Sequence, residues 1–236
     1  MNAEPGSSPY LILFDMDGTL IDGAPAIVAA MDRAFAAIGR GAPEAAQVRS
    51  VIGLDLDRAM LSLAPDLSQA ELVRAVAAYR EAFVLARRDG GAEAGAPIYP
   101  GMRGLLERLS SSPALLGVAT GKARRGLDFA LEAHGLGGYF ATLHCASDGP
   151  GKPHPAMIER AMAFAGAERS STVMVGDATY DMEMAKNAGV WAIGVSWGYH
   201  TAQALEAAGA VAVIDSADAL EPALDRLWGR VWRNDT

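Results

Sequence analysis

The stretch Tyr10-Leu-Ile-Leu-Phe14, followed by Asp15-Met-Asp-Gly-Thr19, places two acidic residues directly after an apolar run. An unbroken apolar run of this length predicts a strand that is buried on both faces. Asp15 and Asp17 would then lie at the end of a buried strand, where ionised carboxylates need a compensating charge. A divalent cation supplies that charge, and ligands that are all oxygen suit magnesium. Taken alone, the stretch is also compatible with an acidic turn that caps a helix.

Five further apolar runs have the same character, and helical patterns lie between them. These predicted strands span 115–119, 142–146, 172–175, 191–195 and 211–214, and a last helix is expected over 220–232. The alternation predicts an α/β fold, in which a Rossmann-like parallel sheet carries helices on both faces. Ligands of such sheets bind at the carboxyl ends of the strands, so the loops that follow the strands are the candidate site.

One region, from 24 to 88, shows helical stripes and no strand pattern. Ser68 and Glu71 have the spacing of a capping box at the start of one of these helices. Glycine-rich segments at 22–23 and 89–97 flank the region and suit hinges. We therefore predict an inserted α-helical cap domain at 23–96, within a core formed by 1–22 and 97–236. The alternative is that these helices pack on the sheet as one long crossover, which a strand-free stretch of roughly 65 residues disfavours.

Three further loops place polar residues after predicted strands. Thr120 and Gly121 offer a hydroxyl and a backbone N–H at the expected start of a helix, which suits an anion. Lys152 follows a glycine and precedes a proline, so its ammonium would be a rigidly placed charge for a phosphate. Asp177 ends a strand, and Asp181 would lie in the first turn of the next helix. Each feature alone is ordinary, as a helix cap or a solvated lysine, but the four in this order are specific.

This order of motifs resembles the haloacid dehalogenase-like hydrolase superfamily, and within it the helical-cap subfamily typified by phosphoglycolate phosphatases. The resemblance covers nearly the whole chain. The motifs that carry it are Phe14-Asp-Met-Asp-Gly-Thr-Leu-Ile-Asp22, Thr120-Gly-Lys122, Gly151-Lys-Pro-His-Pro155 and Gly176-Asp177 with Asp181, supported by Tyr99-Pro-Gly-Met102 and Trp197-Gly-Tyr199.

The resemblance implies a catalytic and metal-binding role for four aspartates. Asp15 would attack phosphorus as the nucleophile, and Asp17 would protonate the leaving oxygen and later deprotonate water. Mg2+ would be held by the side chains of Asp15 and Asp177 and by the backbone carbonyl of Asp17. Asp181 would orient the magnesium shell or the neighbouring lysine. Phosphoryl transfer needs such positioning and charge neutralisation on general grounds as well.

The resemblance also implies a phosphate site made by Thr120, the Gly121 N–H and Lys152, and a small phosphomonoester as substrate, with phosphoglycolate first. Two positions depart from the family pattern. Ala178 stands where many relatives have a hydroxyl residue, and Gly23 replaces a common Ser or Thr, which suggests a looser cap hinge.

Other readings of the same motifs stay open. A phosphosugar mutase of the β-phosphoglucomutase type would use the same core, although such relatives often have Val where this chain has Thr19. A dehalogenase would lack the second aspartate, so Asp17 argues against that activity. A non-catalytic binding or regulatory protein could also use this fold, but it would be expected to have lost a core residue.

Composition limits partners and location. The net charge is −8, which argues against nucleic-acid binding. No apolar run reaches the roughly 18 residues of a membrane span, and the first nine residues do not resemble a signal peptide. The single cysteine, Cys145, suits a reduced cytoplasmic protein and a buried thiol. We expect a cytoplasmic monomer or homodimer, whose cap arginines Arg49, Arg58 and Arg74 could pair with a substrate carboxylate.

Overall fold

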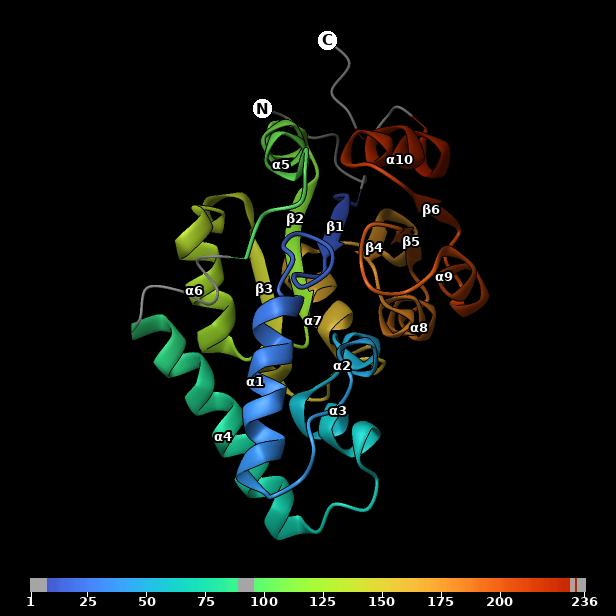
Figure 1. Cartoon of the computed structure of the whole chain (residues 1–236). Helices are drawn as coiled ribbons and strands as arrows, with labels where there is room; N and C mark the ends of the chain where they lie inside the picture. Colours follow the sequence, from blue (N-terminus) through green and yellow to red (C-terminus); the bar gives the residue numbers. More distant parts are fainter. Residues whose placement is uncertain (1–7, 89–95, 230–231, 233–236) are drawn as a thin grey trace.

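The computed structural model describes residues 8–88, 96–229 and 232, whose strands form one parallel six-stranded sheet in the order β3-β2-β1-β4-β5-β6 (Figure 1). Every predicted strand is present, so the predicted α/β fold is confirmed. The chain leaves β1 toward one edge and later returns to the other side of β1, which puts a topological switch point between β1 and β4. The strands are β1 (Leu11–Phe14), β2 (Leu115–Thr120), β3 (Thr142–Cys145), β4 (Thr172–Gly176), β5 (Trp191–Val195) and β6 (Ala212–Ile214).

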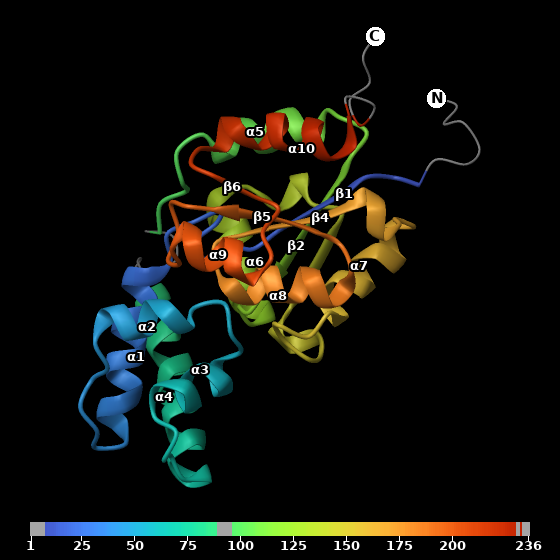
Figure 2. The same cartoon turned by 90° about the vertical axis from the view of Figure 1, so that its right-hand side faces the viewer.

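Both faces of the sheet are covered by helices, which explains the unbroken apolar runs. On β1, Ile12 and Phe14 pack against one helix layer, while Leu11 and Leu13 pack against the other. Figure 2 shows α5 and α10 on one side of the strands and α7 and α8 on the other. The first layer contains α5 (Met102–Ser110), α6 (Arg124–His134) and α10 (Leu220–Trp228), and the second contains α7 (Ala156–Ala165), α8 (Thr179–Ala188) and α9 (Ala202–Ala208).

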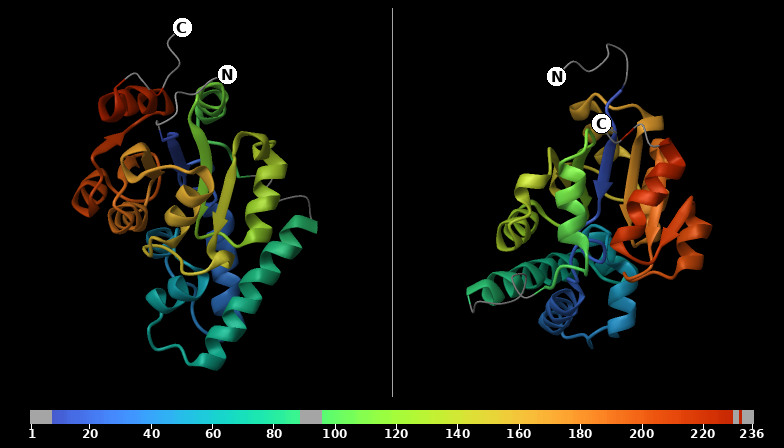
Figure 3. Two further views of the ribbon diagram at one scale, coloured as in Figure 1. Left: turned by 180° about the vertical axis from the view of Figure 1, so that it is seen from behind. Right: turned by 90° about the horizontal axis from the view of Figure 1, so that it is seen from above.

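The segment 24–88 is helical and contains no strand, as predicted. Its helices are α1 (Ala24–Ala37), α2 (Ala45–Val51), α3 (Leu56–Leu63) and α4 (Gln69–Arg88), and they enclose an apolar cluster of their own. Figure 1 and the left view of Figure 3 show α1 and α4 running side by side, beyond the end of the sheet. The predicted capping box starts α4, because the Ser68 N–H donates to Glu71 (2.9 Å) and the Glu71 N–H donates to Ser68 (3.3 Å).

The boundaries of the cap at 23 and 96 stay a prediction. The glycine-rich hinge predicted at 89–97 lies, for residues 89–95, outside the described part of the chain, and so does the N-terminal segment 1–7. Across the described ranges, no helix combines the length and the apolar content that crossing a membrane requires.

The last helix is shorter than predicted. It ends at Trp228 rather than at Trp232, because Gly229 adopts a left-handed φ of 68° that breaks the helical path. Trp232 is nevertheless buried, and its indole N–H donates to Asp225 at 2.9 Å. The indoles of Trp191 and Trp228 both donate to the carbonyl of Ser170, which ties α10 to the start of β5.

Candidate active site

The predicted site residues meet at the carboxyl end of the sheet. Asp15 follows β1, Thr120 ends β2 and Asp177 follows β4, while Lys152 comes from the loop before α7. All four side chains are almost inaccessible to solvent. Asp17 lies beside them and is 7% exposed. Burying this many polar groups costs free energy. Their convergence therefore indicates a functional site rather than an acidic turn that caps a helix.

Lys152 is fully buried and bridges two of the aspartates. Its Nζ lies 2.7 Å from Asp15 Oδ1 and 2.6 Å from Asp181 Oδ1. Burial alone would lower the pKa of Lys152, but the charges of Asp15 and Asp181 outweigh it and raise the pKa above its usual value. The alternative interpretation of Lys152 as a solvated loop residue is therefore wrong.

Asp177 is held by neutral donors. Thr19 Oγ1 donates to Asp177 Oδ1 at 3.0 Å, and the Tyr199 N–H donates to Oδ2 at 2.9 Å. A Cβ on Gly18 or Gly198 would collide with this carboxylate, so the loops after β1 and β5 need glycine to approach it. Burial, together with repulsion from the other buried aspartates, raises the pKa of Asp177 well above its ordinary range.

Further hydrogen bonds, which do not involve Asp177, hold the loop after β1 in place. The indole N–H of Trp197 donates to the Thr19 carbonyl at 3.1 Å, and the Tyr199 hydroxyl donates to Asp22 at 3.1 Å. Trp197 and Tyr199 belong to a motif that supports the family resemblance, but the sequence alone predicted no role for either residue. Their place after the fifth predicted strand, at the same sheet edge, was the signal that could have found them.

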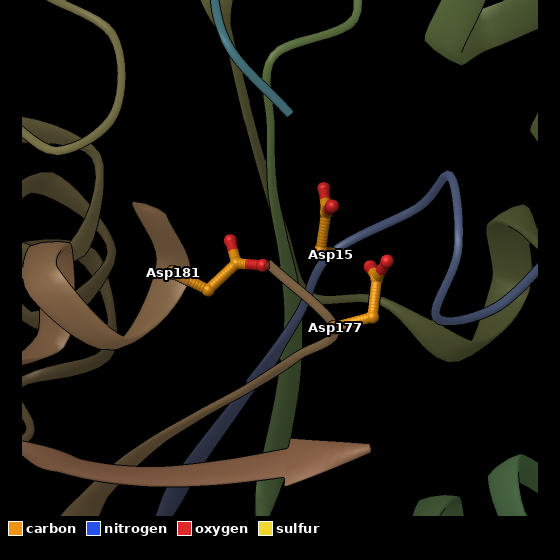
Figure 4. A group of neighbouring side chains, drawn as sticks. All are labelled: Asp15, Asp177 and Asp181. Atoms are coloured by element: carbon orange, nitrogen blue, oxygen red, sulfur yellow. The ribbon is translucent and has the colours of Figure 1, made fainter. Parts of the chain in front are cut away.

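Three carboxylates come close enough together to hold one cation. Oxygen atoms of Asp15, Asp177 and Asp181 lie within 4.8 Å of one another, and all three residues are buried (Figure 4). Lys152 is the only buried lysine or arginine among the residues whose burial the structure describes, and it faces three carboxylates, so the cluster keeps an excess of negative charge. Buried carboxylate oxygens with such an excess fit Mg2+, which binds hard oxygen ligands.

Asp181 lies in the first turn of α8, as predicted, and both of its oxygens already have partners. Oδ1 pairs with Lys152, and Oδ2 accepts the Ala178 N–H at 3.1 Å. Burial raises the pKa of Asp181 to about 6, with Lys152 opposing the shift. These contacts favour a positioning role for Asp181.

Asp17 forms an ion pair with Lys122, a residue of the Thr120-Gly-Lys122 motif to which the sequence alone assigned no role. Lys122 Nζ lies 3.0 Å from Asp17 Oδ2, and each side chain is 9% exposed. The same ammonium lies 5.9 Å from the centre of the Phe83 ring in α4. The signal was its position two residues after Thr120, in a loop at the sheet edge. Gly23 also bears on Asp17, because a Cβ there would collide with Asp17 Oδ1.

The loop after β2 differs from the prediction. Thr120 was expected at the start of a helix, yet it is the last residue of β2, and α6 begins only at Arg124. The helix dipole therefore does not act at Thr120, whose hydroxyl accepts the Lys122 N–H at 3.3 Å. Gly121 touches the cap instead, since a Cβ there would collide with the Gly53 carbonyl.

The cap segment 53–58, which is the loop before α3 and the first turn of that helix, makes two further contacts with the core. Arg58 Nη1 donates to the Lys152 carbonyl at 3.0 Å, and the backbone of Gly151 hydrogen-bonds Asp55. Arg58 lines the cavity between cap and core, but the other two candidate arginines, Arg49 and Arg74, do not line it.

Two residues outside the acidic cluster have structural surroundings, and the buried thiol predicted for Cys145 is one of them. Cys145 is fully buried at the end of β3, and burial raises the pKa of its thiol, which disfavours the nucleophilic thiolate. His154 precedes α7, where its Nδ1 accepts the Ala156 N–H at 3.2 Å, so it belongs to the start of that helix.

Comparison of the chain with known protein families, sequences and structures agrees with this geometry. A model of the haloacid dehalogenase-like hydrolase family matches residues 12–195. A Dickeya dadantii protein named probable phosphatase IndB is 36% identical over 208 residues, covering 87% of this chain and 89% of that protein. Phosphoglycolate phosphatase of Pseudomonas putida is 32% identical over 222 residues, covering 92% and 80%. The crystal structure of a predicted phosphatase from Clostridium acetobutylicum has a TM-score of 0.82 at 24% identity, covering 93% and 100%, which shows likeness of fold.

The chain belongs to the haloacid dehalogenase-like hydrolase family. Within it, the chain is a phosphatase, as the curated relatives are named.

Proposed function

We propose that the protein is a Mg2+-dependent phosphatase that hydrolyses a small phosphomonoester through an aspartyl-phosphate on Asp15. The observation that carries this proposal is the fully buried Lys152 ammonium, 2.7 Å from Asp15. A carboxylate that approaches an anionic phosphate is repelled unless positive charge stands beside it. Lys152 supplies that charge at Asp15, the aspartate that directly follows β1.

The chemistry proceeds in two displacements. An Asp15 carboxylate oxygen attacks phosphorus in line with the ester oxygen, the bond to that oxygen breaks, and Asp17 gives the departing alcohol its proton. Asp17, now ionised, takes a proton from water as the water oxygen attacks the phosphorus of the aspartyl-phosphate. The acyl phosphate bond breaks, inorganic phosphate leaves, and the Asp15 carboxylate is restored.

The surrounding residues hold the transferring group. Lys152, the Thr120 hydroxyl and the Gly121 N–H would bind phosphoryl oxygens, and Asp181 would keep Lys152 in place. The Asp15 and Asp177 side chains and the Asp17 backbone carbonyl would bind Mg2+, which supplies neutralisation of the phosphate charge. Lys122, 3.0 Å from Asp17, would hold the general acid in position.

The relatives named phosphoglycolate phosphatase make phosphoglycolate the first substrate to test. A mutase of the β-phosphoglucomutase type would use the same core. Such mutases often have Val at the position of Thr19, and Val could not make the hydrogen bond that the Thr19 hydroxyl donates to Asp177, so Thr19 favours the phosphatase. We further propose a cytoplasmic monomer or homodimer.

The test is phosphate release from a panel of small phosphate esters, with Mg2+ and with EDTA. Release that requires Mg2+, and that returns when Mg2+ is added back after chelation, supports the proposal. Release that survives chelation removes the metal site. If phosphate is released from none of the esters, the phosphatase assignment fails, and isomerisation of hexose phosphates becomes the next assay.

A further inference from the structure

A cavity of about 570 Å3 lies between the cap helices and the sheet edge. We call it the cap pocket. Asp15, Asp17 and Thr120 line one part of it, and apolar side chains line most of the rest. A cavity of this size accommodates a drug-sized ligand, so a two-carbon acid would leave most of its apolar wall facing water. Apolar wall residues include Ile27, Met31, Val51, Ile52, Tyr79 and Phe83.

The charges of the cap pocket do not favour a substrate with a second carboxylate. Among the pocket's cations, Lys122 pairs with Asp17, and Arg58 donates to the Lys152 carbonyl. Arg80 and Arg125 also line the pocket, but both are exposed. An exposed arginine contributes little to holding an anion, because water screens the interaction. The buried wall contributed by the cap is apolar, as Met31 (2% exposed) illustrates.

An aromatic pair lies next to the proposed general acid. The Phe83 and Tyr79 rings in α4 have centroids 5.2 Å apart at an angle of 51°. Lys122 links this pair to Asp17, with its ammonium 3.0 Å from the carboxylate and 5.9 Å from the Phe83 ring centre. The part of a substrate that extends from the ester oxygen toward the cap therefore meets aromatic and aliphatic surface.

We propose that the physiological substrate is a phosphomonoester of an apolar alcohol that carries a ring or a body of similar size, with Phe83 as a specificity-determining residue. This inference rests on the proposed phosphatase function and refines its substrate beyond phosphoglycolate. The phosphate binds at Asp15 and Lys152, and the apolar part fills the cap pocket against α1 and α4.

The test compares ethyl phosphate, 2-phenylethyl phosphate and phosphoglycolate at saturating Mg2+. The first two release primary alcohols of similar basicity, so a difference between them reports contact with the pocket rather than leaving-group chemistry. We expect kcat/KM for 2-phenylethyl phosphate to exceed that for ethyl phosphate by about tenfold or more, which corresponds to burying one phenyl group. It should also exceed that for phosphoglycolate.

Variants of α4 locate the effect. Phe83→Ala should lower the ratio of kcat/KM between 2-phenylethyl and ethyl phosphate by about tenfold, whereas Phe83→Leu should keep most of it. Val73→Ala is the matched control, because Val73 lies on the same helix, is 59% exposed and does not line the pocket. Circular dichroism confirms that each variant is folded, and the comparison of esters on the unmodified protein decides the inference even if Phe83→Ala does not fold.

The outcomes separate the two proposals. If phosphoglycolate is the better substrate, if the phenyl group brings no gain, or if folded Phe83→Ala leaves the ratio unchanged, the inference is overturned while the phosphatase stands. If none of the three esters releases phosphate with Mg2+, the phosphatase itself is overturned, and this inference with it.

Discussion

At the residue scale, Asp15 is the carboxylate on which the proposed chemistry depends. Replacing it by asparagine removes the nucleophile and one partner of Lys152, while Asp181 still pairs with the ammonium. The change also removes one of three crowded negative charges. We therefore expect Asp15→Asn to abolish turnover and leave the protein folded, as measured by phosphate release and by thermal unfolding. Substantial residual turnover would refute the nucleophile assignment.

Gly23 leaves the space that the Asp17 carboxylate occupies. Its backbone angles (φ −82°, ψ −9°) suit any residue, so alanine is excluded only by contact with Asp17 Oδ1. We expect Gly23→Ala to displace that carboxylate and to lower kcat by about tenfold or more, with little change in the melting temperature. Gly41→Ala is the matched control, because a Cβ there meets nothing within 4 Å. Equal kcat values for the two variants would contradict this role of Gly23.

The acidic residues of the site could be predicted because buried carboxylates after apolar strands are unusual on physical grounds. The positions of Asp15 and Asp177 follow from that rule, and Asp181 follows from the expected first turn of the next helix. The donors that surround them could not be derived in the same way. Lys122, which pairs with Asp17, lies in the loop between β2 and α6, and loop geometry leaves no periodic signal in the sequence.

At the scale of elements, two glycine-containing loops meet across the boundary between cap and core. Gly121 follows β2, and a side chain there would press on the Gly53 carbonyl of the cap loop. We expect the added methyl group of Gly121→Ala to push the cap loop away from the core. kcat/KM should then fall, and amide hydrogen exchange at residues 51–58 should increase. Gly137→Ala, where a Cβ has open space, is the control. Unchanged exchange at 51–58 in Gly121→Ala would show that the contact does not keep the cap closed.

The elements themselves were largely predictable. Strands buried on both faces read as unbroken apolar runs, and α8 ends at Ala188, directly before Gly189 in the left-handed conformation that commonly ends helices. The errors lie at element ends. Continuing the apolar stripe of α10 past Gly229 ignored the backbone freedom of glycine, and Thr120 was assigned to a helix that begins four residues later. Local interactions decide such ends, whereas periodicity reports only the middle of an element.

At the scale of the whole molecule, the buried acids tie stability to pH and to metal. Burial raises the pKa of Asp177, and it raises that of Asp181 from 3.8 to about 6. A raised pKa means that folding favours the protonated carboxyl. The metal-free protein should therefore lose stability as pH rises from about 3.8 to about 6.

Mg2+ should offset this loss because it compensates the ionised carboxylates. We expect the rise in melting temperature between EDTA and Mg2+ to be larger at neutral pH than near pH 5. Asp177→Asn should reduce the rise at both values. An equal rise at both pH values, or one that persists in Asp177→Asn, would contradict the metal site.

The four tryptophans are unevenly distributed with respect to this site. Trp191 and Trp228 share the Ser170 carbonyl, and Trp232 packs nearby against Trp228. Trp197 alone donates to Thr19, whose hydroxyl binds Asp177. The protein therefore carries its own optical reporter: ligand binding at Asp177 should change the fluorescence of one indole against a steady background from the other three. Trp197→Phe would identify that signal, so that site occupancy could be followed in stopped-flow experiments without a label.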